Sequence, residues 1–188
     1  MDRREALRRV GMIMGGAVSL PLASSVLSGC QTAPSTASAY SLQTLTPDQD
    51  ELVATIAELI IPTTDTPGAR AALVNEYIDI VATDYMTEEQ RTQFVAGLGD
   101  VDAAAQAAHG SSFVDCTEEQ QIALLTEMEN EAYDSQGEDP HFFMMMKQMT
   151  LTGYYTSEIG ATQELMYVHE AGIYRPDIPY SEIGKAYS

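Results

Sequence analysis

Apolar residues recur at helical spacing along most of the chain beyond residue 46, and polar runs with helix-capping chemistry separate the apolar segments. The first segment starts at Thr46, which suits an N-cap, and Pro47 follows at the first helical position. Gln49 completes a capping box with Thr46. The pattern therefore predicts a helix that ends at Ile61-Pro62. Its apolar face consists of Leu52, Val53, Ile56, Leu59 and Ile60.

Two further capping boxes, Thr87-Glu-Glu-Gln90 and Thr117-Glu-Glu-Gln120, predict two more helix starts. In the helix from residue 88, Gly97 and Gly99 each cost about 1 kcal/mol relative to alanine. We therefore expect a break near Gly99-Asp100 and an alanine-rich continuation to residue 108. The apolar positions are Phe94 and Leu98 in the first helix, and Ile122, Leu125, Met128 and Ala132 in the second.

Two other apolar segments complete the helical part of the chain. Asp139-Pro140 is expected to cap and start the most apolar helix, which should be central and most buried because it is apolar around most of its circumference. Its run of methionines could suit a soft metal such as copper, but continuity with phenylalanines favours core packing. The apolar positions are Leu73, Tyr77, Ile80 and Val81 in a helix over 69–84, and Phe142, Phe143, Met144, Met145, Met146, Met149 and Leu151 in the central helix.

These patterns predict an all-α fold, a single bundle of about five helices with an irregular, tyrosine-rich C-terminal tail from Gly153 onward. The tail tyrosines either pack over the helices or form an interface, where tyrosine is enriched. The loop 62–69 is turn chemistry throughout, and it is either a plain helix connector or a partner contact. The tail tyrosines are Tyr154, Tyr155, Tyr167, Tyr174, Tyr180 and Tyr187.

The first thirty residues have the composition of an export signal, with a basic start, a modest apolar middle and small residues at the end. Arg3-Arg4 resembles a twin-arginine signal, and Cys30, after Leu-Ser-Gly, resembles the acylated cysteine of a bacterial lipobox. We therefore expect a signal peptide over 1–29, a flexible tether over 30–41 and one helical domain over 42–188. The expected location is the periplasm, with a lipid anchor in the membrane.

The chain is strongly acidic, with a formal net charge of −19. Removing residues 1–29 takes away four arginines and two acids, which leaves five basic and 26 acidic side chains and a net charge of −21. Such a surface repels nucleic-acid phosphates and anionic lipid headgroups. We expect no nucleic-acid partner, and membrane attachment through an anchor only.

Candidate catalytic chemistry is sparse in this sequence. Nucleotide-binding, hydrolase and zinc-protease motifs and a haem-attachment motif are absent from it. His109, His141 and His169 lack metal-ligand spacing and are expected at the surface or at caps. Cys116 is flanked by acids, which disfavour a thiolate, so a buried packing role is expected. We expect no catalytic, metal or cofactor-binding residues in this chain.

Several stretches resemble the gluconate 2-dehydrogenase subunit 3 family across roughly residues 42–188. They are Leu45-Thr46 with the helix that follows, Ile60-Ile61-Pro62 with Asp65 and Pro67-Gly68-Ala69, the stretch TGYYTSEIG at 152–160, and the Gly172-Ile-Tyr174 turn. The resemblance implies a small non-catalytic subunit whose partner is a large FAD-binding flavoprotein of the glucose–methanol–choline type. In such complexes a c-type cytochrome with haem often passes electrons on, and the small subunit carries the flavoprotein through the twin-arginine translocase.

On this resemblance the interface with the flavoprotein comprises the loop and the tail. The residues expected there are Asp65, Pro67, Gly68, Tyr154, Tyr155 and Tyr174. The lipobox departs from some relatives and implies that an acyl anchor could replace a membrane cytochrome. The alternative is a stand-alone periplasmic lipoprotein that binds a ligand or another envelope protein, which predicts a stable monomer with a proper pocket.

Overall fold

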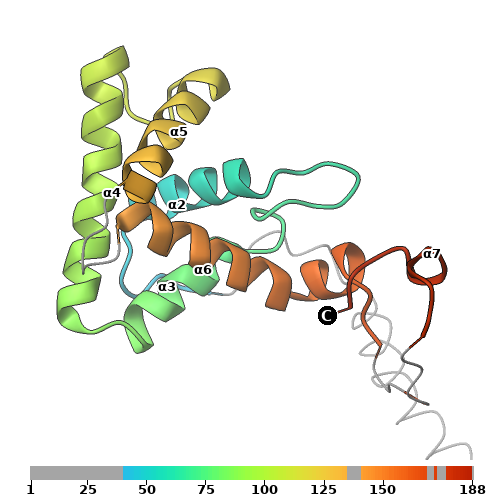
Figure 1. The fold of residues 1–188 in the computed structure, drawn as a ribbon. Helices are drawn as coiled ribbons and strands as arrows, with labels where there is room; N and C mark the ends of the chain where they lie inside the picture. The colour runs from blue at the N-terminus through green and yellow to red at the C-terminus, as the bar shows by residue number, and fades with distance from the viewer. Residues whose placement is uncertain (1–39, 135–140, 169–171, 173–176, 188) are drawn as a thin grey trace, which may run out of the picture. The chain divides into compact units, whose positions relative to one another are not determined.

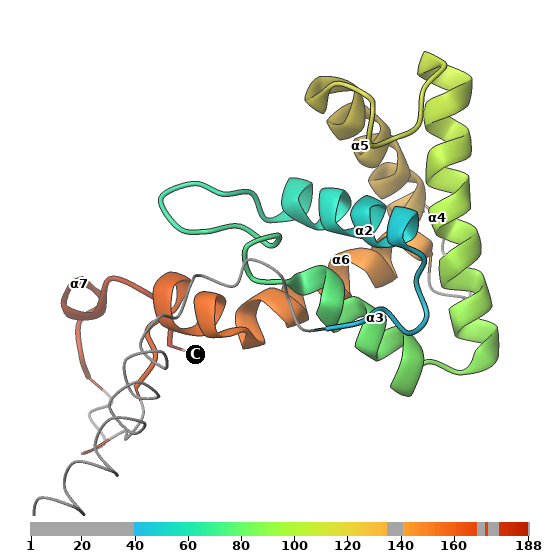
Figure 2. The ribbon, with the colours of Figure 1, turned by 180° about the vertical axis from the view of Figure 1, so that it is seen from behind.

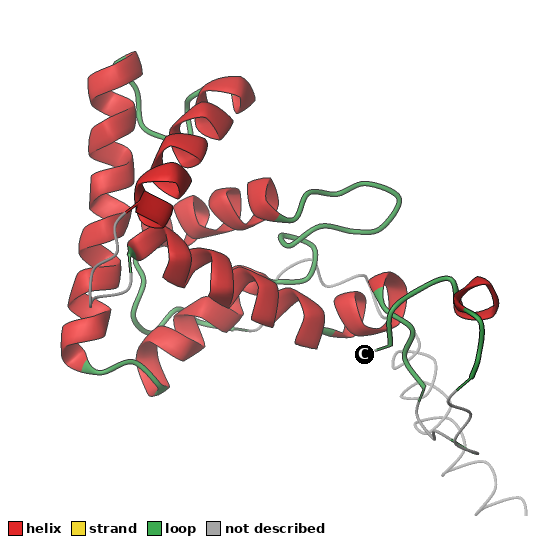
Figure 3. Cartoon of the chain, viewed as in Figure 1, coloured by secondary structure: helices red, strands yellow, loops and turns green. Residues whose placement is uncertain are grey.

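The computed structural model describes residues 40–134, 141–168, 172 and 177–187. The chain divides into two compact units, Met1–Ser41 and Leu42–Ser188, and every described helix belongs to the second. Helices and loops make up the described residues (Figure 3), apart from one isolated bridge between Met166 and Tyr187. The predicted all-α fold is therefore confirmed. The helices are α2 (Pro47–Ile60), α3 (Val74–Asp84), α4 (Glu88–His109), α5 (Glu118–Asp134), α6 (Phe142–Thr156), the π-helix η1 (Gly160–Glu164) and the short α7 (Tyr180–Ile183).

Helix α6 is the centre of the bundle, as its composition predicts. It contacts α2, α3, α4, α5 and η1, and α4 runs across the ends of α2 and α6 (Figures 1 and 2). Met146 is fully buried, and Met144 and Met149 pack against the core, so these three methionines serve packing. The buried residues of α6 are Phe142, Phe143, Met146, Thr150, Gly153 and Tyr154.

All three predicted capping boxes form. At the start of α2, Gln49 N–H donates to Thr46 Oγ1 over 3.3 Å, and Thr46 N–H donates to Gln49 Oε1 over 3.0 Å. The pairs Thr87 with Gln90 and Thr117 with Gln120 repeat this exchange at α4 and α5. These caps fix the helix starts locally, because each satisfies two backbone donors that have no intrahelical partner.

The predicted break in α4 is wrong, because the helix runs without interruption from Glu88 to His109. Gly97 lies where α4 meets α6, and a Cβ atom there would stand 2.3 Å from the Phe142 ring. This close packing offsets the low helix propensity of glycine. Gly99 faces open space and its helix cost is simply tolerated. The helix ends at Gly110, whose φ of 74° is left-handed.

The predicted faces of α3 and α5 are wrong in part. Helix α3 begins five residues later than predicted, at Val74, because residues 69–73 form a turn and Leu73 is left-handed with φ 55°. Leu73 is 49% exposed, and Ile122 of α5, also expected in the core, is 48% exposed. The buried residues are Val74, Ile78, Asp79 and Ala82 in α3, and Gln121, Leu124, Leu125 and Ala132 in α5. In both helices a buried polar side chain occupies a position that an apolar pattern assigns to solvent.

The C-terminal segment departs from helix later than predicted. Gly153 to Thr156 still belong to α6, and η1 follows before the irregular tail begins. Met166 N–H then donates to Ala186 O over 2.7 Å, which closes the described tail on itself. Tyr167, Tyr180 and Tyr187 are all more than half exposed, at 55%, 71% and 53%.

Several predicted features lie outside the described residues. These are Arg3, Arg4 and Cys30 of the signal, the tether up to residue 39, the cap at Asp139-Pro140, and His169 and Tyr174. Within the described residues, none of the helices has both the length and the apolar character that crossing a bilayer requires.

Candidate partner-binding site

The connection between α2 and α3, residues 61–73, is the longest loop among the helices α2 to α6. We call it the α2–α3 loop. It extends beyond the end of α2 in both views (Figures 1 and 2). Its tip, from Pro62 to Asp65, is exposed, whereas Gly68 and Ala69 at its base are buried. The loop therefore presents a polar tip, with the Asp65 carboxylate, from a base fixed in the core.

One carboxylate holds both ends of this loop. Glu58 Oε1 accepts hydrogen bonds from the Thr63 backbone N–H over 2.9 Å and from the Thr63 hydroxyl over 2.7 Å. Glu58 Oε2 accepts from the Arg70 backbone N–H over 2.9 Å. Burial raises the pKa of Glu58, but these hydrogen bonds from Arg70 and Thr63 outweigh it and hold the pKa below its ordinary value.

Gly68 is required by this arrangement. A Cβ atom at this position would lie 2.5 Å from both carboxylate oxygens of Glu58 and 2.6 Å from the Thr63 backbone nitrogen. The Gly68 N–H also donates to Thr63 Oγ1 over 3.0 Å. Only glycine lets the backbone of the loop approach Glu58 and Thr63 so closely at this position.

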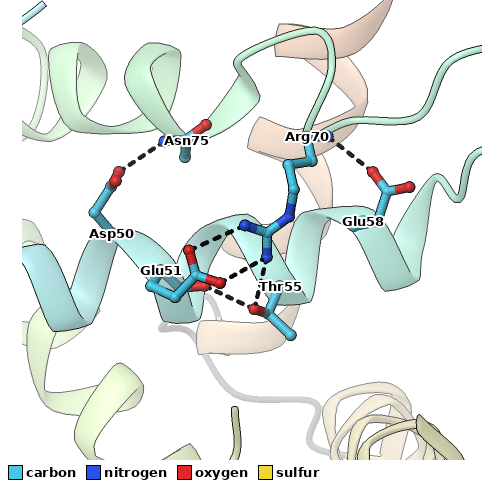
Figure 4. Close-up of polar contacts among 6 residues, drawn as sticks. All are labelled: Asp50, Glu51, Thr55, Glu58, Arg70 and Asn75. Atoms are coloured by element: carbon cyan, nitrogen blue, oxygen red, sulfur yellow. Dashed lines mark hydrogen bonds and ion pairs between the residues drawn. The ribbon is translucent and has the colours of Figure 1, made fainter. Parts of the chain in front are cut away.

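A second set of polar contacts ties the end of the α2–α3 loop and the start of α3 to α2 (Figure 4). The Arg70 guanidinium binds both carboxylate oxygens of Glu51, each over 3.0 Å, and Thr55 Oγ1 over 2.9 Å. The hydrogen bond to Glu51 raises the pKa of Arg70. One turn further along, Asn75 Nδ2 donates to Asp50 Oδ1 over 2.9 Å. A bidentate arginine–carboxylate pair has a fixed geometry, so these contacts orient the loop as well as hold it.

The loop is also fastened to α6 and η1, which are distant in sequence. Tyr154 is 1% exposed, and its hydroxyl donates to Pro67 O over 2.8 Å. Burial raises the pKa of this hydroxyl, which keeps it a donor. Thr66 Oγ1 donates to Glu164 Oε2 of η1 over 2.7 Å. The structure thus brings two of the predicted interface residues, Pro67 and Tyr154, into direct contact.

The other predicted interface residues lie at different depths. Asp65 is exposed at the loop tip, and Gly68 is buried under it. Tyr155 is 39% exposed on α6, with its ring edge-on to that of Tyr154 at 5.3 Å between centroids. In this structure Tyr154 reaches no surface and acts on the loop from beneath. Glu58, Arg70, Thr66 and Glu164, which hold the loop, were missed because their spacing carries no sequence signal.

A third anchor, also missed, fixes the chain before α2. Asp79 of α3 is completely buried and accepts hydrogen bonds from three successive backbone N–H groups. The bond from Gln43 is 2.8 Å, that from Thr44 is 3.0 Å and that from Leu45 is 2.7 Å. The residues that lead into the helical unit are therefore held against α3.

The basic side chains among the described residues are all engaged within the chain. Arg70 binds Glu51, and Arg91 donates from Nε to Ala82 O at the end of α3 over 2.8 Å. Lys147 pairs with Glu129, and Lys185 donates to Gln163 O. The chain as a whole has 28 acidic and nine basic side chains. The described surface therefore offers carboxylates and hydroxyls to a partner rather than uncommitted cations.

Cys116, His109 and His141, the other described residues considered for chemistry, contact residues of their own chain. Cys116 is buried, as expected, and its Sγ lies 3.4 Å from Ser111 Oγ. His109 ends α4 and contacts Gln120, while His141 is the N-cap of α6 and accepts from Phe143 N–H. Among the described residues, no group of three or more His, Cys, Asp or Glu side chains could hold a metal ion.

By its fold the chain is a small all-α protein, in which the other helices of the bundle pack around α6 and the α2–α3 loop is anchored at its base. The chain belongs to the gluconate 2-dehydrogenase subunit 3 family, whose sequence model matches residues 47–172. The match begins at the first residue of α2 and includes α2 to α6, the α2–α3 loop and η1. This family is an accessory subunit of a dehydrogenase complex. No curated protein and no solved structure matches the chain.

Proposed function

We propose that this chain is the small subunit of a periplasmic FAD-dependent sugar or sugar-acid dehydrogenase, and that it escorts and stabilises the flavoprotein subunit. In this proposal the large subunit, of the glucose–methanol–choline type, holds FAD and oxidises the substrate. A c-type cytochrome with haem is a candidate third component. Arg3-Arg4 directs export of the folded pair through the twin-arginine translocase, and Cys30 carries the lipid anchor.

The observation that carries the proposal is the family match together with the way the α2–α3 loop is held. The loop is held by Glu58 of α2 and by Tyr154 of α6, and its own Arg70 is paired with Glu51. Holding a loop in one conformation before binding lowers the entropy lost on association. The exposed tyrosines of the tail add side chains that are enriched at interfaces.

The test is a purification from the native cell. The full-length chain with a C-terminal tag is isolated gently, and its visible spectrum and its co-purifying proteins are recorded. We expect a flavin spectrum and one large partner. Replacing Arg3-Arg4 by Lys-Lys should then leave both proteins in the cytoplasm. A colourless chain without a partner would contradict the proposal and favour a stand-alone lipoprotein.

A further inference from the structure

A groove of about 420 Å³ lies beside the α2–α3 loop, between α2 and the first turns of α5. We call it the α2–α5 groove. Its apolar side chains are Leu59, Pro62 and Ile122, and its polar ones include Glu58, Glu118 and Gln121. It shares Glu58 and Thr63 with the anchoring of the loop. Anything bound there would therefore also contact the loop.

The apolar side of the groove is a surface that the fold leaves uncovered. Ile122 is 48% exposed, although Leu124 and Leu125 of the same helix are buried. Leu59 is half-buried and Pro62 is exposed. An isolated exposed apolar residue is ordinary, but these three line one concave site.

The polar side of the groove accepts hydrogen bonds. Gln121 is only 7% exposed, and both of its hydrogen bonds use Nε2, which donates to Phe113 O over 2.8 Å and to Val114 O over 3.4 Å. Its Oε1 accepts no hydrogen bond from a described residue. Every fully buried side-chain oxygen or nitrogen among the described residues has a partner, so Oε1 is not fully buried. Because Gln121 lines the groove, we infer that its Oε1 is reached from there.

The charge of the groove is negative. Glu58 and Glu118 are carboxylates, whereas the Arg70 cation in the same wall is already paired with Glu51. The groove thus combines an apolar side with hydrogen-bond acceptors, at Glu118 and Gln121 Oε1, that no described residue occupies. Arginine and lysine match it, because their aliphatic stems pack on apolar surface while their charged heads donate hydrogen bonds.

We propose that the α2–α5 groove binds an arginine- or lysine-bearing segment of the partner subunit, with the stem on Leu59 and Ile122 and the head at Glu118 and Gln121. This inference rests on the proposed function. A second copy of this chain is a poor occupant, because it carries the same net charge of −19 and its described basic side chains are engaged internally.

The first test places a photo-crosslinking amino acid at position 122 of the full-length chain in its native cell. We expect a covalent product with the large partner, and mass spectrometry should place the link at or directly beside an arginine or lysine of that partner. A link to a second copy, a link to the chain's own tail at Arg175, or no link in a complex that still forms would each overturn the proposal.

The second test compares Ile122→Lys with Ala123→Lys, which adds the same charge at the neighbouring exposed position of α5. A cation in the groove should repel the partner's cation and lower the recovered flavoprotein by about tenfold, whereas the control should change it by less than about twofold. Matching circular dichroism and melting curves of the two variants would exclude misfolding.

The outcomes separate the two proposals. Equal recovery with Ile122→Lys and with the unaltered chain would overturn the groove and leave the proposed function standing. If the unaltered chain recovers no flavoprotein, both are overturned.

Discussion

Replacing Asp79 by asparagine tests how strongly one buried carboxylate holds the start of the helical unit. In the structure its Oδ1 accepts from the backbone N–H groups of Thr44 and Leu45, and its Oδ2 accepts from that of Gln43. Asparagine keeps one acceptor oxygen, so the Thr44 and Leu45 bonds can remain. Its amide nitrogen, however, would face the Gln43 N–H, donor against donor.

The magnitude follows from the bonds that change. A hydrogen bond to a charged group contributes about 1.5–3 kcal/mol and a neutral one about 0.5–1.5 kcal/mol. The two retained bonds therefore lose about 1 kcal/mol each, and the third loses about 1–2 kcal/mol. Relief from burying a charge offsets part of this loss. We expect a net destabilisation of about 2 kcal/mol, which lowers Tm by about 6–8 °C in a domain of this size.

The assay is thermal unfolding of the full chain, followed by circular dichroism. Asp84→Asn is the matched control, because Asp84 lies in the same helix and is exposed, and it should shift stability by no more than about 0.5 kcal/mol. Hydrogen exchange adds a local readout, since the Gln43 amide, which loses its acceptor, should exchange faster only in the Asp79 variant. A Tm change equal to that of the control would refute the reasoning.

Three further changes probe the packing and the loop. Gly97→Ala should destabilise the protein by about 1–3 kcal/mol because the new Cβ overlaps a ring of α6, whereas Gly99→Ala should stabilise it by up to about 1 kcal/mol. Urea unfolding of both variants measures the two changes in the free energy of unfolding, and changes of the same sign would contradict the prediction. Tyr154→Phe leaves a loop carbonyl without its donor and should cost about 1 kcal/mol and speed proteolysis of the loop, while Tyr155→Phe should do neither. The lowered pKa of Glu58 means that its carboxylate stabilises the fold above its ordinary value of 4.5 and that this contribution is lost as the pH falls through the lowered pKa. Glu58→Gln should therefore be less stable near neutral pH and should lose less stability on acidification. Urea unfolding of both proteins at about pH 6 and about pH 3.5 measures this difference, and the same pH dependence in the two proteins would contradict the reasoning.

The helix starts show what can be predicted locally. A threonine followed three residues later by glutamine marks α2, α4 and α5, and each of these caps forms as predicted. The apolar character of Phe142, Phe143 and Met146 likewise predicts the central place of α6. These predictions succeed because a cap involves residues within one turn of each other and because a helix that is apolar on most sides has to be covered.

The faces of α3 and α5 show where local reasoning fails. Asp79 and Gln121 look like solvent positions, but both are buried because their partners come from elsewhere in the chain, at residues 43–45 and 113–114. Ile122, which looks like a core position, is left at the surface instead. By propensity Gly97 is a weak point of α4, yet a Cβ atom there would stand 2.3 Å from the Phe142 ring of α6.

The sequence by itself determined the all-α fold, the order of its helices, most of their starts and the distinctiveness of the 62–69 loop, because these depend on interactions within a few residues. Only the tertiary structure decided which residues hold that loop. Glu58 and Arg70 are 12 residues apart, Pro67 and Tyr154 are 87 apart, and Thr66 and Glu164 are 98 apart. Each of these contacts forms between side chains that only the packing of α2, α6 and η1 brings within hydrogen-bond distance, and no local pattern encodes that packing.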